Sequence, residues 1–318
     1  MPKYRNDLPQ LGDTLFLTDS GLETTLIFHD GMELPHFASF DLLKTAAGRK
    51  RLRDYYELHA RTAVENRMGF VLESVTWRAN PDWAKKLGYD ARSLAFANRD
   101  AIDMLVDIRR EFETPASPMV ISGNLGPRGD GYDPGRLMSA AEAEDYHCTQ
   151  IDTLSWTEAD FISGFTINNV PEAVGIVRAA KRLEVPSVIS FTLETDGRLP
   201  TGQTLQEAIE TTDAETGGAA AYFMINCAHP THFEDALKAN AAWTQRIRGL
   251  RANASRRSHA ELDSSPDLDA GDPIELGRQY RDLRRSFGHL TMLGGCCGTD
   301  HRHVREIARF CSSAEALA

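Results

Sequence analysis

Three cysteines lie where two predicted strands end. Cys227 closes the apolar run AYFMINC, and Cys296 and Cys297 close the run TMLGGCC. The carboxyl ends of parallel strands in a barrel meet on one face, so these sulfurs can be neighbours although they are far apart in the sequence. Three thiolates form a soft, sulfur-rich site, and zinc is the metal that such ligands favour, at about 2.3 Å.

A disulfide is the alternative for these cysteines, and a fourth protein ligand is a second one. Adjacent cysteines such as Cys296 and Cys297 are poor disulfide partners, and a cytoplasmic chain has little use for structural bridges. His229, two residues after Cys227, would complete a closed structural Cys₃His site. Two residues at a strand end seldom both turn inward, so we favour three cysteines and an open fourth position, which is typical of a catalytic zinc.

The residues around the cysteine pair and the two other cysteines fit this interpretation. Gly294, Gly295 and Gly298 are expected to let the backbone turn so that both consecutive sulfurs face one point. Cys148 and Cys311 fall in helical patterns and are expected to be ordinary buried small hydrophobic residues. The predicted metal centre therefore uses three of the five cysteines.

The predicted ligand set indicates which reaction suits the site. A zinc ion with three thiolates is electron-rich and a weak Lewis acid, so it polarises water poorly. It is better suited to holding a substrate thiol, because metal coordination deprotonates a thiol. Alkyl transfer to sulfur is therefore the reaction class that we predict, whereas a hydrolase would more naturally use histidine and carboxylate ligands.

Short apolar runs alternate with longer helical patterns along the chain, which is typical of a parallel sheet with crossover helices. The predicted strands are Leu15–Ser20, Gly69–Val75, Met119–Gly123, Phe161–Ile167, Ser187–Leu193, Ala221–Cys227, Arg248–Ala252 and Thr291–Cys296. The predicted helices are Arg49–Arg67, Arg92–Glu113, Ala140–Glu158, Pro171–Leu183, Leu205–Thr212, His232–Ala241, Pro273–Phe287 and His301–Cys311.

Strict alternation of eight strands and eight helices predicts an α/β fold, a single closed (β/α)₈ TIM barrel. The rival, a doubly wound open sheet, lacks its G-x-G-x-x-G after the first strand. We expect one domain over residues 1–318, with a long polar loop at about 253–272. Such a loop is either a functional lid or a solvated surface segment.

The composition restricts the partners of the chain. It has 318 residues with 46 acidic and 35 basic side chains, a net charge of −11, and no cluster of Lys and Arg. We therefore expect no nucleic-acid partner. No stretch approaches the roughly 18 apolar residues of a membrane span, and no secretion signal is evident. A cytoplasmic protein that acts on small molecules is the expectation, with homo-oligomerisation possible.

Several segments resemble the homocysteine S-methyltransferases, a zinc-dependent barrel family that includes betaine–homocysteine methyltransferase and the homocysteine domain of methionine synthase. LGGCCGTDHRHVREIA (Leu293–Ala308) is similar to the family's GGCCGT signature and the helix after it. INC (Ile225–Cys227) is similar to the segment with the upstream zinc cysteine, and LTDSGLETTL (Leu17–Leu26) to the first-strand segment. SGNLGP (Ser122–Pro127) and SFTLETDGRLPTGQTL (Ser190–Leu205) are weaker similarities.

The resemblance implies that Cys227, Cys296 and Cys297 bind Zn²⁺, in agreement with their residue types. It further implies that Asp19 and the backbone around Gly21 hold the amino-acid end of the acceptor. The alternative for Asp19 is a turn or N-cap role. The full set of expected substrate contacts is Asp19, Gly21, Glu23, Glu73, Trp77 and Asn226, of which Glu23 fits a solvated first-turn acid equally well.

The sequence departs from the family pattern at the end of the fourth predicted strand. Phe165 stands where the family usually has a glutamate that contacts the homocysteine amine. Glu73 or Glu194 could compensate, or the acceptor is a different thiol. Trp77 is either a contact for a cationic methyl donor, which an indole face attracts by about 0.5–2 kcal/mol, or a packed tryptophan.

The predicted function is zinc-dependent methyl transfer from an onium donor to the thiol of homocysteine, giving methionine. S-methylmethionine, S-adenosylmethionine or a betaine-like compound would serve as donor. A corrinoid domain is not expected beside a barrel in a chain of 318 residues. The alternatives are another thiol acceptor, a zinc-dependent hydrolase or lyase on the same barrel, and a non-catalytic zinc-binding relative.

Overall fold

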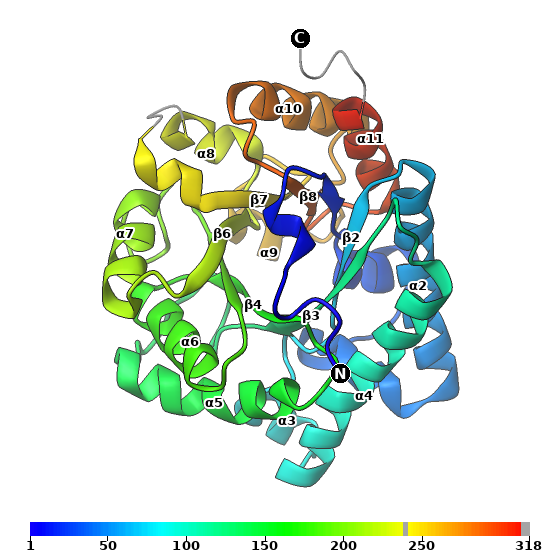
Figure 1. The fold of residues 1–318 in the computed structure, drawn as a ribbon, viewed down its shortest axis with the longest axis vertical. Coiled ribbons are helices and arrows are strands. Elements are labelled where there is room, and N and C mark those ends of the chain that lie inside the picture. Colours follow the sequence, from blue (N-terminus) through cyan, green and yellow to red (C-terminus); the bar gives the residue numbers. More distant parts are fainter. Residues whose placement is uncertain (238–240, 313–318) are drawn as a thin grey trace.

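A computed structural model describes residues 1–237 and 241–312, and its central feature is a closed barrel of eight parallel strands (Figure 1). The strands are β1 (Phe16–Leu17), β2 (Gly69–Glu73), β3 (Met119–Leu125), β4 (Phe161–Ile167), β5 (Ser187–Thr192), β6 (Ala220–Asn226), β7 (Ile247–Ala252) and β8 (Met292–Gly295). Each strand pairs with the next, and β1 closes the barrel by pairing with β8. The predicted (β/α)₈ fold is confirmed.

Helices surround the barrel and connect its strands (Figure 1). They are α1 (Leu22–Thr24), α2 (Ala46–Glu65), α3 (Pro81–Lys86), α4 (Ala91–Phe112), α5 (Ala140–Ser155), α6 (Val170–Arg182), α7 (Leu205–Thr216), α8 (Pro230–Leu237), α9 (His259–Asp263), α10 (Pro273–Ser286) and α11 (His301–Ser312). The sequence missed the short helices α1, α3 and α9. The predicted helix His232–Ala241 corresponds to α8, but its residues 238–240 lie outside the described chain.

Side-chain caps determine where many of these helices begin. The capping side chains, each of which accepts a hydrogen bond from a backbone N–H in the first turn, are Thr45, Asn80, Asp90, Ser139, Asn169, Thr204, Ser258 and Asp272. Such caps stabilise a helix start by about 1 kcal/mol each. Within the described part of the chain, no helix is long and apolar enough to cross a membrane.

The strands are buried on both faces, which explains their nearly continuous apolar sequences. On β2, Phe70 and Leu72 pack outward in the layer between barrel and helices, whereas Val71 packs inside the barrel. The N-terminal segment adds Leu8 to this inner cluster. Toward the carboxyl ends of the strands the interior becomes polar, with Glu73 and other buried charged side chains, and this end forms the site.

The predicted polar loop at about 253–272 connects β7 to α10 and contains α9. Its beginning is buried: Asn253 and Ser255 are 1 % and 3 % exposed, and His259 at the start of α9 is 5 % exposed. This part of the loop is therefore packed against the barrel and is not a solvated surface segment.

Candidate active site and metal centre

The three predicted ligands converge at the carboxyl end of the barrel. The Sγ atoms of Cys227, Cys296 and Cys297 all lie within 4.8 Å of one another, and those of Cys227 and Cys296 are 2.7 Å apart. Tetrahedral zinc with bonds of 2.3 Å separates its sulfur ligands by about 3.8 Å, so small side-chain rotations would admit the ion. All five cysteines are free. The donor set therefore fits a thiolate-bound zinc.

His229 is not part of this cluster. Among the described residues, the group that could hold a metal contains the three cysteines and no histidine. The Nδ1 atom of His229 lies 2.8 Å from the hydroxyl of Thr231, and burial lowers the pKa of His229 to about 4. This geometry favours three protein ligands over a closed Cys₃His site.

Cys227 is placed by a backbone turn directly after β6. The strand ends at Asn226, one residue earlier than predicted, because Cys227 has a φ of 54°. This left-handed conformation is uncommon for a residue other than glycine and ends the regular strand geometry. The amide of Cys227 donates to the carbonyl of Arg251 at 3.2 Å, which holds the turn against β7.

The glycines before the cysteine pair have a different role from the predicted one. Gly294 and Gly295 belong to β8, and only Gly298 has a positive φ, 79°. A Cβ at Gly294 would lie 1.9 Å from the Thr18 hydroxyl oxygen, and one at Gly295 would lie 2.1 Å from that of Thr299. Gly294 and Gly295 therefore allow neighbouring segments to approach closely. The turn with a positive φ lies at Gly298, after the cysteine pair.

Asn226 orients the cysteine cluster through its carboxamide. Its Nδ2 donates to the Sγ of Cys227 at 3.2 Å and to the hydroxyl of Thr166 at 2.9 Å, while its Oδ1 accepts from the Thr166 amide. Hydrogen bonds from neighbouring thiols lower the pKa of Cys296 well below its ordinary value. The same sulfur contacts raise the pKa of Cys227 and of Cys297, so Cys296 is the cysteine of the cluster that is most readily deprotonated.

Two aromatic residues that sequence reasoning missed border the sulfurs. The hydroxyl of Tyr132, in the segment after β3, lies 3.3 Å from the Sγ of Cys297. Its ring stacks on that of His259 with centroids 3.8 Å apart. His259 in turn lies 2.6 Å from the carbonyl oxygen of Cys227 and 3.3 Å from Glu194. The segments after β3, β5 and β7 thus meet beside the cysteines.

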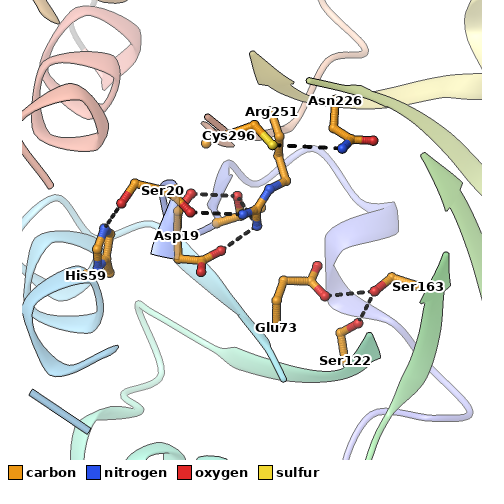
Figure 2. Close-up of polar contacts among 12 residues, drawn as sticks. Asp19, Ser20, His59, Glu73, Ser122, Ser163, Asn226, Arg251 and Cys296 are labelled. Carbon is orange, nitrogen blue, oxygen red and sulfur yellow. Dashed lines mark hydrogen bonds and ion pairs between the residues drawn. The ribbon is translucent and has the colours of Figure 1, made fainter. Parts of the chain in front are cut away.

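Asp19 forms a buried ion pair with Arg251, another residue that the sequence reasoning missed (Figure 2). The Oδ2 atom of Asp19 accepts a hydrogen bond from Tyr55 at 3.0 Å. Arg251 also donates to the Thr18 hydroxyl at 3.0 Å and to the Ser20 carbonyl at 3.2 Å. Burial opposes the charge on Arg251, but the nearby carboxylates, chiefly Asp19, outweigh burial and raise its pKa.

Glu73 and Glu23 lie near this pair in different surroundings. Glu73, at the end of β2, is 4 % exposed and accepts a hydrogen bond from Ser163 at 2.8 Å (Figure 2). Burial raises its pKa to about 7. Glu23 is half-buried, accepts from Ser39 at 3.0 Å, and has a pKa that burial also raises. It is not the freely solvated acid that was the alternative.

The remaining two predicted substrate contacts, Gly21 and Trp77, form hydrogen bonds to other residues of the protein. The amide of Gly21 donates to Thr299, and a Cβ there would lie 2.6 Å from the carbonyl oxygen of Cys296. Trp77 donates from Nε1 to the carbonyl of Phe165 at 3.1 Å, and the guanidinium of Arg78 lies 4.1 Å from its ring centroid. Trp77 is therefore near Phe165 but already carries a cation over its ring.

The raised pKa of Glu73 predicts a specific pH dependence of stability. The pKa rises from 4.5 to about 7 on folding, so between these values the folded protein binds more protons than the unfolded one. The free energy of unfolding must then fall as the pH rises through this window, by up to about 3 kcal/mol. In Glu73→Gln this loss is absent.

Urea denaturation of both proteins from pH 4.5 to 8 measures this effect. The variant should gain stability relative to the unchanged protein as the pH rises, and the difference should level off above about pH 7. A difference that does not change with pH would contradict the assignment.

The fold and the site together define the class of this protein. It is a parallel (β/α)₈ barrel with a candidate thiolate metal centre, made by three cysteine sulfurs at the carboxyl ends of β6 and β8. A profile of the homocysteine S-methyltransferase family matches residues 16–311. The chain belongs to this family.

Individual relatives are distant. Homocysteine S-methyltransferase 1 of Brassica oleracea var. italica is 25% identical over 181 residues, 55% of this chain and 53% of that protein. The match thus spans about half the length of that relative. Homocysteine S-methyltransferase 4 of Zea mays is 23% identical over 94% of this chain and 90% of that protein.

Solved structures show the same fold. The oxidized form of the homocysteine methyltransferase MmuM from Escherichia coli has a TM-score of 0.75 at 18% identity, with 96% of this chain and 99% of that chain covered. The metallated form of MmuM has a TM-score of 0.74 at 17% identity, with 96% and 98% covered.

Proposed function

We propose that this protein transfers a methyl group from a small onium compound to the thiol of homocysteine, giving methionine, and that it holds Zn²⁺ through Cys227, Cys296 and Cys297. The observation that carries the proposal is the convergence of these three sulfurs at the carboxyl end of the barrel. This is the end of a TIM barrel where active sites lie. Membership of the family supports methyl transfer as the reaction.

Zinc, when bound, would keep the acceptor thiol deprotonated near neutral pH, so no protein base is needed. The chain's own residues then have orienting roles. Asn226 fixes the position of Cys227, and Tyr132 contacts Cys297, so both limit the motion of the sulfur ligands. Partners of this kind typically change metal affinity or activity by about 10–100-fold when they are removed.

The reaction moves one methyl group, and the positive charge of the onium centre is balanced by the proton that the acceptor thiol releases. The acceptor sulfur forms a bond to the methyl carbon while the bond between that carbon and the onium centre breaks, and the electron pair of the broken bond stays on the donor atom, which becomes neutral. The acceptor's thiol proton goes to solvent. S-methylmethionine, S-adenosylmethionine and betaine-like compounds all meet this requirement. Trp77 stays a candidate donor contact, in competition with the Arg78 side chain over its ring.

The test is product formation by reduced, zinc-loaded protein with homocysteine and each donor in turn. If the donor carries ¹³C-labelled methyl groups and the homocysteine carries a deuterium-labelled carbon chain, mass spectrometry should find both labels in the same methionine molecule. The double label distinguishes this product from the methionine that S-methylmethionine itself becomes when it loses a methyl group. No donor should lose its methyl group when homocysteine is left out. Methyl loss at the same rate without a thiol would indicate hydrolysis instead, and no doubly labelled methionine from any donor would refute the proposal.

A further inference from the structure

Arg251 stands between the strands that carry the cysteines. In the sheet register it pairs with Asn226 on β6, the residue before Cys227, and with Gly294 on β8, two residues before Cys296. On β7, the neighbouring Leu250 and Ala252 pack outward against the helix layer. Since side chains alternate along a strand, Arg251 faces the barrel interior. Its guanidinium lies 5.0 Å from the ring centroid of Phe165.

The carboxylates around Arg251 are already engaged. Asp19 uses one oxygen for Arg251 (Figure 2) and the other for Tyr55. Glu73 accepts from Ser163, and burial raises its pKa to about 7, so near neutral pH it carries only part of a charge. An ammonium group placed here would meet the positive Arg251 guanidinium, and the charge of the Asp19 carboxylate beside it is already paired with that guanidinium.

A carboxylate group on the acceptor would instead be attracted to the Arg251 guanidinium and could accept hydrogen bonds from it. A guanidinium has five N–H donors, and the bonds of Arg251 to Thr18, Asp19 and Ser20 use three of them. Arg251 remains 8 % exposed, so its burial is not complete. Arginine binds carboxylates through paired, charge-assisted hydrogen bonds, which are among the strongest in proteins.

We propose that Arg251 is the specificity-determining residue for the acceptor: it binds the acceptor's carboxylate, and an ammonium group on the acceptor is dispensable. The acceptor class is therefore small mercapto-carboxylic acids. Homocysteine belongs to this class, and so does its deaminated analogue 4-mercaptobutanoate. This inference rests on the proposed function, because it concerns the thiol that the same site binds.

The experiment compares three thiols on the unmodified, zinc-loaded protein. They are homocysteine, 4-mercaptobutanoate, which lacks the ammonium group, and 3-mercaptopropylamine, which lacks the carboxylate. Isothermal titration calorimetry measures binding, and kcat/KM with an active donor measures transfer. We expect 4-mercaptobutanoate to bind within about tenfold of homocysteine and 3-mercaptopropylamine to bind at least about a hundredfold more weakly, since a polar site left unpaired rejects a ligand strongly. Binding of the amine as tight as that of homocysteine would overturn the inference.

A variant comparison assigns the effect to Arg251. Arg251→Gln should lose affinity for the two carboxylate thiols and gain relative affinity for 3-mercaptopropylamine, because Asp19 is then free to accept an ammonium group. Arg251→Lys should restore part of the carboxylate preference. Arg248→Gln is the matched control on the same strand, since Arg248 bonds the Gly12 carbonyl toward the other end of β7. An unchanged order of the three thiols in Arg251→Gln would overturn the assignment.

The outcomes separate this inference from the proposed function. If methionine forms but both analogues bind equally, the function stands and the role of Arg251 fails. If the carboxylate thiols bind selectively and no donor methylates any of them, the role of Arg251 stands and the proposed reaction fails. If Arg251→Gln does not fold, the relative affinities of the three thiols for the unmodified protein still test whether the acceptor's carboxylate is the group that is recognised.

Discussion

Replacing Cys297 with serine is expected to abolish zinc binding and methyl transfer together. A serine hydroxyl is a much poorer zinc ligand than a thiolate, and two cysteines alone do not make a tight site. Removal of an outer partner already costs about 10–100-fold, so loss of a direct ligand should lower kcat/KM by about a thousandfold or more. Zinc content by mass spectrometry and the rate of thiol methylation measure the two effects.

Cys148→Ser is the matched control for this change. Cys148 lies on α5, is half-buried, and contacts Arg182 instead of the sulfur cluster. This variant should keep about one zinc per chain and its full rate. A Cys297→Ser protein that folds, binds no zinc and still methylates thiols at the original rate would show that the cluster is not the catalytic centre.

The second large effect is expected at Gly294, where an added methyl group has no space. In Gly294→Ala the new Cβ would meet the Thr18 hydroxyl at 1.9 Å and the Asp19 carbonyl oxygen at 2.8 Å. The second contact is to backbone, so β1 and β8 must move apart. Overpacking of this kind costs about 1–3 kcal/mol and occasionally more, and we expect about 3 kcal/mol from chemical denaturation. Zinc affinity should fall too, because β8 carries Cys296.

Gly288→Ala, in the connection between α10 and β8, provides the comparison. A Cβ at Gly288 would meet nothing within 4 Å, and its φ is not in the left-handed region. Its stability should change by no more than about 0.5 kcal/mol. If Gly294→Ala were as stable as Gly288→Ala, the close approach of β1 and β8 would not be a constraint on this site.

The fold and the convergence of the three cysteines could be predicted from the sequence because both depend on local patterns. Alternating strand and helix patterns gave the barrel, and the barrel itself brings strand ends such as Cys227 and Cys296 together. The short helices α1, α3 and α9 were not predicted, because a segment of three to six residues is too short to show helical periodicity. The extent of β6 was wrong by one residue, because nothing in the sequence indicated the positive φ of Cys227.

The acceptor end of the site could not be predicted in the same way. Whether Asp19 is free or paired depends on which inward-facing residue of β7 lies opposite it. The sequence predicts that strand, Arg248–Ala252, only weakly, because RGLRA contains no β-branched residue. The signal for Arg251 was its position in RGLRA, two residues after Gly249, with Leu250 and Ala252 pointing outward. Tyr132 and His259 come from long connections, whose path a sequence pattern does not determine.

Methyl transfer to a thiol by this protein should depend on a zinc ion held by the three cysteines. The most direct test is to prepare the reduced protein with graded zinc contents and to measure thiol methylation in each preparation with the same donor. We expect the rate to rise in proportion to bound zinc and to level off at one zinc per chain. A rate that is independent of zinc content, or that continues to rise well beyond one zinc per chain, would contradict a catalytic role for zinc at the three cysteines.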